Sequence, residues 1–140
     1  SERLTDSERR NYCEKVNSYV QKHYLESPQM EFLANKFGYD GNAQMLRRDF
    51  IRYYGTTPAA ISKIKKLEEA KRLLATTTYS MKEIAVKLKY KSHTHFGMDF
   101  KNNIGMTPAE YRKAIKAKRE KQMNTKDYQM NLKDYLAKMC

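Results

Sequence analysis

The chain has 140 residues, with 28 lysines and arginines against 16 aspartates and glutamates, so its net charge at pH 7 is +12 and nucleic acid is the leading partner. Hydrophobic residues make up 40% of the sequence, which excludes a disordered chain and allows one modest core or two very small domains. No apolar run is long enough to span a bilayer, and we expect Cys13 and Cys140 to be free thiols in a reducing cytoplasm.

The first expected helix covers residues 7–24, where apolar side chains recur at helical spacing. This stripe consists of Tyr12, Val16, Tyr19, Val20 and Tyr24. Ser27-Pro28 then ends the helix and opens a short second one, because proline suits a first helical turn and disfavours helix in the residue before it. The packed side chains of the second helix are Phe32, Leu33 and Phe37. Gly38 supplies a left-handed stop.

A third helix is expected from about Asn42 to Tyr54, with Gly55 as its end. Thr57-Pro58 then starts a longer helix over about residues 59–76, because threonine caps free N–H groups and proline fits the first helical position. The apolar stripe of this linker helix is Ile61, Ile64, Leu67, Ala70 and Leu74.

Two capping boxes predict the starts of the next helices, Ser80 with Glu83 and Thr107 with Glu110. Between them, Ser92 caps a helix that Gly105 ends. Seven helices therefore fit residues 7–118, and no alternating strand pattern occurs. The fold class that we expect is all-α.

A basic C-terminal extension covers residues 119–140. It is expected to be helical, with an eighth helix after Asn124-Thr125 interrupts the run of charged residues from Lys113 to Lys121. Its apolar stripe is Tyr128, Leu132, Tyr135, Leu136 and Met139. We expect this stripe to pack back on the domain, with another chain or a partner as the alternatives.

One pattern occurs twice in the sequence. The first copy is Leu33-Ala34, Tyr39, Leu46, Phe50 and Gly55-Thr56-Thr57-Pro58-Ala59, and the second is Ile84-Ala85, Tyr90, Phe96, Phe100 and Gly105-Met106-Thr107-Pro108-Ala109. Phe50 and Phe100 are 50 residues apart, whereas Ala34 and Ala85 are 51 apart. The first copy therefore has one extra residue near positions 40–44. Two short helices that meet through a turn predict a helix-turn-helix, whose second helix is free to enter a major groove. Periodicity alone also fits stacked helical hairpins that bind a protein.

The matching motifs resemble the DNA-binding domain of the AraC/XylS family of bacterial transcription regulators. They are Leu33-Ala34, Leu46-Arg47-Arg48-Asp49-Phe50, Gly55-Thr56-Thr57-Pro58, Lys66-Leu67-Glu68-Glu69-Ala70-Lys71-Arg72-Leu73-Leu74, Ser80-Met81-Lys82-Glu83-Ile84-Ala85, Tyr90-Lys91-Ser92, Phe96 with Phe100-Lys101, and Gly105-Met106-Thr107-Pro108-Ala109-Glu110-Tyr111-Arg112. The resemblance covers roughly residues 12–112 in unbroken order. It implies one AraC-type domain over residues 7–118, with helix-turn-helix units at about 28–55 and 80–105 joined by the linker helix at 59–76.

The resemblance also implies two recognition helices that face successive major-groove segments of double-stranded DNA. By position, the base contacts are Asn42, Ala43, Gln44, Arg47, Arg48, His93, Thr94, His95 and Met98. The phosphate contacts are Arg52, Lys91, Ser92 and Lys101, with Arg52 as the counterpart of Lys101. Arginine can pair with guanine and glutamine with adenine. The alternative for Arg47 and Arg48 is a solvent-exposed helix face that binds nothing.

The second unit departs from the family pattern at two positions. Met98 stands where the family has arginine, and the neighbouring Gly97 weakens the helix by roughly 1 kcal/mol relative to alanine. Lys89 replaces the family's glycine, so we expect the second turn to be built differently. Charge is uneven too, since residues 1–61 hold nine basic and eight acidic side chains and most of the positive charge follows. The first unit is therefore expected to discriminate bases and the second to bind phosphate.

Other functions have less support in the sequence. His93 and His95 point to different faces of a helix and lack further ligands, so we expect no metal site. The sequence has no phosphate-binding glycine loop and no nucleophile–base pair at a recognisable spacing, so we expect no cofactor and no enzyme activity. The function expected is sequence-specific transcription regulation in the bacterial cytoplasm, on the nucleoid, without membrane contact. The alternatives are a non-specific architectural nucleic-acid-binding protein and a helical protein-interaction module. RNA polymerase and an upstream sensor domain in a longer chain are further candidate partners.

Overall fold

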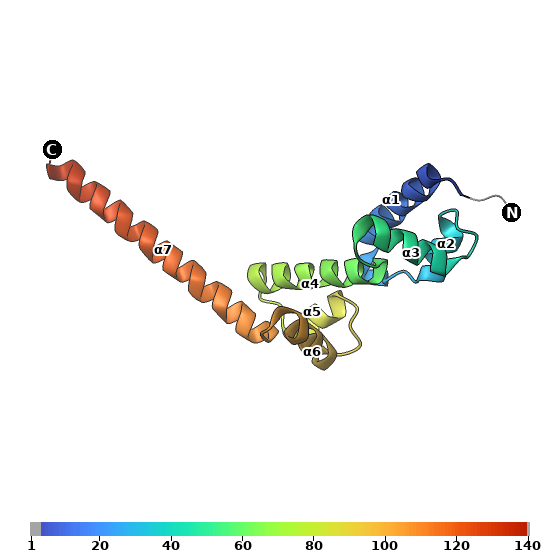
Figure 1. Ribbon diagram of the computed structural model, residues 1–140. Coiled ribbons are helices and arrows are strands. Elements are labelled where there is room, and N and C mark those ends of the chain that lie inside the picture. The colour runs from blue at the N-terminus through green and yellow to red at the C-terminus, as the bar shows by residue number, and fades with distance from the viewer. Residues whose placement is uncertain (1–3, 140) are drawn as a thin grey trace. The chain divides into compact units, whose positions relative to one another are not determined.

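The computed structural model describes the backbone of residues 4–139 and the side chains of residues 4–122 and 137. Over this range the protein forms seven α-helices and one short 3-10 helix, without strands (Figure 1). The all-α class and the seven helices expected from the sequence are confirmed. Within the described residues, no helix is both long enough and apolar enough to pass through a membrane. The chain forms two compact units, Ser1–Ala70 and Lys71–Cys140.

The first unit contains two helices that pack on a third. In chain order its elements are α1 (Asp6–Lys22), the 3-10 helix η1 (Tyr24–Glu26), α2 (Met30–Lys36), α3 (Ala43–Tyr54) and most of α4 (Pro58–Thr76). Both α1 and α2 pack on α3. The buried core consists of Cys13, Val16, Val20, Leu33, Ala34, Tyr39, Leu46 and Phe50. Because Leu46 and Phe50 lie one turn apart on α3, one face of that helix is fixed inward and the other is left for contacts.

The second unit is built around two phenylalanines of α6. Besides the end of α4, its elements are α5 (Met81–Lys87), α6 (His93–Ile104) and α7 (Pro108–Met139). Its buried apolar residues are Leu73, Leu74, Ile84, Ala85, Leu88, Phe96 and Phe100. The ring of Phe100 meets Phe96 at 5.9 Å and Tyr111 of α7 at 5.6 Å, both edge to face. The contact with Tyr111 joins α6 to α7, and α5 packs on α6 as well.

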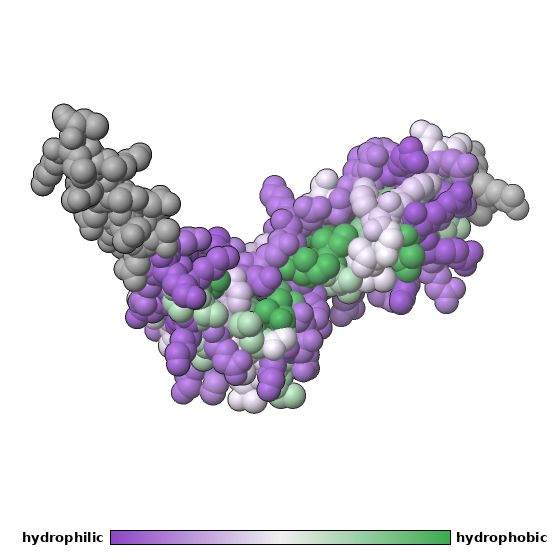
Figure 2. All heavy atoms as spheres, turned by 60° about the vertical axis from the view of Figure 1, so that its left-hand side comes forward, coloured by the Kyte–Doolittle hydropathy of each residue, from purple (hydrophilic) through white to green (hydrophobic). Residues whose placement is uncertain are grey.

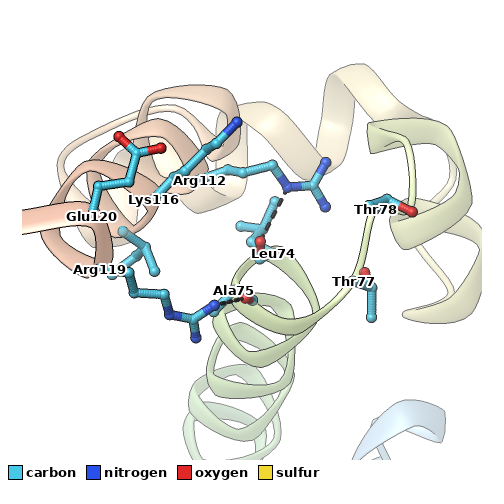
Figure 3. Close-up of a pocket in the computed structure, with 9 residues that line it drawn as sticks. Leu74, Ala75, Thr77, Thr78, Arg112, Lys116, Arg119 and Glu120 are labelled. Carbon is cyan, nitrogen blue, oxygen red and sulfur yellow. Dashed lines mark hydrogen bonds between the residues drawn. The ribbon is translucent and has the colours of Figure 1, made fainter. Parts of the chain in front are cut away.

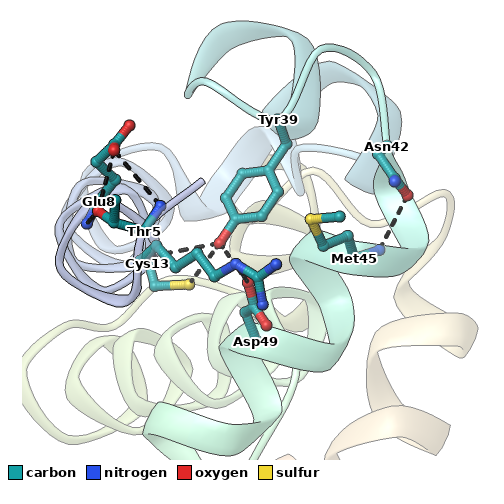
Figure 4. Close-up of polar contacts among 8 residues, drawn as sticks. Thr5, Glu8, Cys13, Tyr39, Asn42, Met45 and Asp49 are labelled. Carbon is teal, nitrogen blue, oxygen red and sulfur yellow. Dashed lines mark hydrogen bonds and ion pairs between the residues drawn. The ribbon is translucent and has the colours of Figure 1, made fainter. Parts of the chain in front are cut away.

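The helix starts agree closely with the capping residues in the sequence. Side-chain oxygens of Thr57, Ser80 and Thr107 accept hydrogen bonds from backbone N–H groups three residues on, at 3.1–3.2 Å. A reciprocal capping box that the sequence analysis missed starts α1, where Thr5 and Glu8 bond each other (Figure 4).

Some boundaries and exposures differ from the expectations. The first helix ends at Lys22, and η1 occupies the stretch before the proline. The second helix starts at Met30 rather than at Pro28, with Gln29 as its N-cap. Figure 2 shows a mainly hydrophilic surface with a few hydrophobic areas. Two side chains expected to pack inward are exposed, Phe32 at 48% and Ile64 at 53%. Periodicity identifies the apolar side of a helix, but it does not say how far the neighbouring helices cover it.

The C-terminal part of the chain is one helix rather than two. Helix α7 runs without interruption from Pro108 to Met139, so the extension is helical as expected through Met139, but the separate eighth helix is wrong. No glycine or proline follows Pro108, and asparagine and threonine lower helix propensity by only about 0.7 kcal/mol each. The apolar stripe expected between Tyr128 and Met139 lies outside the residues whose side chains are described.

Basic side chains at the start of α7 bind the carboxyl end of α4. Arg112 Nε donates to the Leu74 carbonyl at 3.1 Å, and Arg119 Nη1 donates to the Ala75 carbonyl (Figure 3). These carbonyls belong to the last turn of α4, which has no helical N–H partners for them and carries the negative end of the helix dipole. The two arginines therefore cap α4 and line a pocket of about 390 Å³ beside it.

The second turn starts with the same backbone conformation as the first, which corrects the expectation drawn from Lys89. The first turn is one residue longer and has two further left-handed residues, Asp40 and Gly41. Gly38 has φ 84° and Lys89 has φ 60°, so both lie in the left-handed region. After each, the tyrosine N–H donates to the alanine carbonyl of the preceding helix, Tyr39 to Ala34 at 3.0 Å and Tyr90 to Ala85 at 2.9 Å. The lysine thus takes the conformation that glycine takes in the first turn, at a cost of about 1–2 kcal/mol.

Replacing Lys89 by glycine is expected to raise the free energy of unfolding by about 0.5–1 kcal/mol, because relief of left-handed strain exceeds the added freedom of the unfolded chain. Urea unfolding of the two proteins measures this difference. Lys82→Gly, a lysine-to-glycine change inside α5, is the control and is expected to lower stability by about 1 kcal/mol. An unchanged or lower stability for Lys89→Gly would contradict the strain at this turn.

Candidate nucleic-acid interface

Helices α3 and α6 occupy equivalent places in their units, residue for residue at an offset of fifty. Each begins at an N-cap whose side chain bonds the third N–H beyond it, Asn42 to Met45 at 3.1 Å and Ser92 to His95 at 3.0 Å. Each is followed by a glycine with positive φ, Gly55 or Gly105. The cap expected at Ser92 is confirmed. Asn42, which was expected to contact bases, takes the place of Ser92 in the first unit. Its side-chain oxygen accepts the hydrogen bond from the Met45 N–H.

The outward face of each helix carries a row of exposed side chains opposite the buried anchors. The rows follow the i, i+4, i+7 spacing of one helix face. They are Gln44, Arg48 and Ile51 in α3, and Thr94, Met98 and Lys101 in α6. Because these six positions match at the fixed offset, Lys101 corresponds to Ile51. The expectation that Arg52 is the counterpart of Lys101 is therefore wrong.

The flanks of the two rows differ in charge. In α3, Arg47 lies on one side of the row and Arg52 on the other, and both are exposed. The equivalent positions in α6 hold Gly97 and Asn102. A guanidinium presents several donors in a fixed fork, which suits either a guanine edge or a phosphate. The first unit thus brings three arginines to one helix surface, whereas the second brings one lysine to the same surface.

The remaining predicted residues lie at the amino ends of the two helices. Ala43 and His93 are the first helical residues, and Ala43 is half-buried whereas His93 is exposed. The His95 ring packs edge to face on Tyr90 at 5.4 Å, so His95 lies against the turn and away from the central row. Lys91 is exposed in that turn. Its position suits a phosphate better than a base edge.

A tyrosine-to-aspartate hydrogen bond ties the turn to the recognition helix in both units. Tyr39 Oη donates to Asp49 Oδ2 at 2.8 Å (Figure 4), and Tyr90 Oη donates to Asp99 Oδ2 at 2.7 Å. Sequence reasoning missed these four residues as a set. The signal was present, because a tyrosine in the turn and an aspartate just before the second phenylalanine occur in both copies.

These tyrosines remain protonated donors at neutral pH. Burial is the main cause that raises the pKa of the Tyr90 hydroxyl, and the hydrogen bond to Asp99 adds to it. Burial followed by the bond to Asp49 raises the pKa of Tyr39 in the same way. Burial also raises the pKa of the neighbouring Cys13 thiol, which lies 3.6 Å from the Tyr39 hydroxyl and is a free cysteine, as expected.

Replacing Tyr90 by phenylalanine is expected to lower the free energy of unfolding of the second unit by about 1.5 kcal/mol, because a hydrogen bond to a charged group is lost. Thermal or urea unfolding measures the loss. Tyr111→Phe is the control, since the ring of Tyr111 rather than its hydroxyl contacts Phe100. Asp99→Asn keeps an acceptor and is expected to lose less than Asp99→Leu. Equal losses for these two variants would contradict the role of the hydrogen bond.

Comparisons with known proteins agree with this arrangement. A family model described as a helix-turn-helix domain matches residues 33–114. The transcriptional regulator YisR of Bacillus subtilis is 33% identical over 100 residues, which cover 71% of this chain and 34% of that protein. The chain spans about a third of the length of the curated relatives that it matches, MtrA of Neisseria gonorrhoeae among them.

Solved structures share the fold. The DNA-binding domain of AdpA, solved in complex with a target DNA, is 27% identical with a TM-score of 0.67, and the match covers 77% of this chain and 96% of that one. An AraC-type regulator from Chromobacterium violaceum has the same fold at 24% identity and a TM-score of 0.65, over 76% of this chain and 93% of that one. The chain therefore belongs to the AraC/XylS family of transcription regulators and contains the helix-turn-helix DNA-binding domain of that family.

Proposed function

We propose that the chain recognises a specific DNA sequence by placing α3 and α6 in successive major-groove segments. The observation that supports the proposal is the pair of outward rows on α3 and α6. Each row starts two residues after the N-cap of its helix and lies opposite the buried side chains that anchor that helix. An α-helix held in this way fits a major groove, where each base pair shows a distinct pattern of donors and acceptors.

The first row supplies most of the base discrimination. Arg48 suits the O6 and N7 atoms of guanine, and Gln44 suits the N6 and N7 atoms of adenine. Ile51, which is 40% exposed, offers an apolar contact for a thymine methyl group. Arg47 and Arg52 flank this row, where backbone phosphates pass on either side of the groove.

The second row carries less hydrogen-bonding information. Met98 is 61% exposed and can contact a thymine methyl, and Thr94 can bond several bases. Lys101 lies in the central row, so it reaches a base edge or a phosphate at the groove. At the amino end, Lys91 and the free N–H groups behind Ser92 suit a phosphate. The second unit therefore contributes more to affinity than to base choice.

Selection of binding sites from random duplex DNA tests this function. We expect two conserved stretches about 10 bp apart, with stronger base preference in the stretch bound by α3. Gln44→Ala protein is expected to lose preference at one position of that stretch only. A selection that yields no common sequence would contradict the proposal. It would favour the alternative function, a non-specific architectural DNA-binding protein. The observation that supports this alternative is that α6 has Gly97 and Met98 where α3 has two arginines.

Further partners belong to the longer proteins of this family. Since the match covers only about a third of each of these relatives, we propose a sensor domain in a longer chain and RNA polymerase as further partners. Co-purification of this chain with RNA polymerase on a promoter that contains the selected site would test the second partner. Failure to recruit polymerase there would contradict it.

A further inference from the structure

A basic hollow lies beside α3 in the first unit, and one of its walls comes from outside the helix-turn-helix. Its volume is about 380 Å³. The charged and amide side chains that line it are Arg9, Arg48, Arg52, Asp49, Asn42 and Gln44. Arg9 belongs to α1, and it precedes the segment 33–114 that matches the helix-turn-helix family model. No base or phosphate contact expected from the sequence involves this residue.

The charges around the hollow favour an anion. Three guanidinium groups face one carboxylate, that of Asp49, which leaves an excess of two positive charges. Asp49 is already bonded to the Tyr39 hydroxyl at 2.8 Å, and Arg9 Nε lies 3.8 Å from its Oδ2. The amino end of α3 borders the hollow through Asn42, and the positive end of the helix dipole adds to the field.

Arg9 has hydrogen-bonding capacity to spare at this position. Its side chain is only 27% exposed, and its Nε is buried without a hydrogen-bond partner. A guanidinium carries five donors, and a charged donor left unsatisfied in a partly buried place is costly. A phosphate oxygen is the acceptor that best matches the fork of an arginine.

We propose that the hollow binds a phosphodiester of the DNA backbone, with Arg9 of α1 and Arg52 of α3 as its ligands. Arg48 forms the wall toward the base-contacting row, so the phosphate lies on the flank of the first major-groove segment. This inference rests on the proposed function and adds to it a third element, α1, that touches DNA. Arg9 would fix the register of α3 on the duplex without adding base preference.

The experiment compares two adjacent arginines of α1. Arg9→Gln and Arg10→Gln remove the same charge, but the Arg10 guanidinium lies over the Tyr53 ring at 5.5 Å and does not line the hollow. Fluorescence anisotropy with the selected duplex and a scrambled duplex is recorded over a series of salt concentrations. For Arg9→Gln we expect weaker binding to both duplexes alike and a salt slope smaller by about 0.9, the value of one phosphate contact. For Arg10→Gln we expect a clearly smaller change in slope.

Arg9→Lys provides a second variant that keeps the charge beside Asp49. It is expected to keep the salt slope of the wild-type protein, with a moderate loss of affinity because the fork is gone. Circular dichroism and thermal unfolding establish that each variant is folded before binding is measured. If Arg9→Gln is unfolded, scanning the duplex with neutral methylphosphonates tests the same contact. A single neutral methylphosphonate beside the α3 site should weaken DNA binding by the wild-type protein more than it weakens binding by Arg9→Lys.

Four outcomes would overturn the proposal. One is an Arg9→Gln protein with the affinity and slope of Arg10→Gln. Another is a loss of base preference at unchanged slope, which would mean that Arg9 acts through Asp49 and α3. A third is Arg9-dependent binding of inorganic phosphate alone at low concentration, which would assign the hollow to a free anion. The fourth is a wild-type protein that binds neither duplex. That result would contradict the proposed function itself, whereas the first three would contradict only the role of Arg9.

Discussion

Replacing Arg48 by alanine is expected to lower the affinity for the selected duplex about 10- to 100-fold. A bidentate contact with guanine contributes about 1–3 kcal/mol of discrimination, and about 1.4 kcal/mol corresponds to a factor of ten. Arg48 is exposed in the outward row of α3, one turn from Gln44, so its removal leaves the core of the unit intact. Anisotropy titrations with duplexes that vary one base pair at a time would show the preference relaxed at a single position.

Arg52→Ala is the matched control for this variant, since it removes the same side chain one turn further along α3. Because Arg52 lies on the flank toward the hollow, its loss is expected to weaken binding to all sequences alike and to reduce the salt slope by about 0.9. If Arg48→Ala keeps the base preference of the wild-type protein, the base-contacting role of the α3 row is wrong.

Replacing Gly38 by alanine is expected to lower the free energy of unfolding of the first unit by about 3 kcal/mol, from strain and overpacking together. Gly38 has φ 84°, and a Cβ there would lie 2.4 Å from the ring of Tyr12. That ring packs edge to face on Tyr39 at 6.0 Å, so moving it disturbs the residue that anchors α3 through Asp49. Urea unfolding followed by circular dichroism measures the loss.

Gly55→Ala separates the two causes of this effect. Gly55 has φ 73°, but a Cβ there would meet nothing within 4 Å. Only the left-handed strain of about 1–2 kcal/mol then remains. The difference between the two variants is the contribution of the contact with Tyr12. Equal losses for Gly38→Ala and Gly55→Ala would show that the turn adapts to the added methyl group.

Local signals in the sequence predict the fold well wherever a helix has a marked start or end. Ser80 and Thr107 cap helices as expected, and Gly105 takes positive φ at the end of α6. The signals are weaker where nothing marks a boundary. Asn124-Thr125 reads as a break in composition, yet the backbone remains helical because neither residue prevents it. The exposure of Ile64 depends on which helices cover α4, and that is a tertiary property.

The candidate site could be predicted in outline because the second helix of each repeat has a recognisable inner face. Leu46 and Phe50 place Gln44 and Arg48 outward, without any need for a structure. The partners of the polar residues depend on the tertiary structure. Asn42 was expected at the bases, and the structure adds that its side-chain oxygen caps α3 by accepting from the Met45 N–H. Arg9 lies far from α3 in sequence, and only the packing of α1 brings it to the hollow.

Lys89 shows a different limit of sequence reasoning. A lysine in place of the family's glycine suggested a new turn, because left-handed backbone is unfavourable for residues with a Cβ. The backbone keeps the left-handed conformation nevertheless, since the bond from Tyr90 to Ala85 and the packing of the second unit determine it. Tertiary contacts stabilise the turn by more than the local strain costs.

The central claim is that the two outward rows recognise a specific DNA sequence. The most direct measurement is the ratio of affinities for the selected duplex and a scrambled duplex of the same composition, at one fixed salt concentration near physiological. A sequence-specific regulator of this kind is expected to bind the selected duplex at least about 10³-fold more tightly. Equal affinities for the two duplexes would contradict the claim and would make the protein a non-specific binder of nucleic acid.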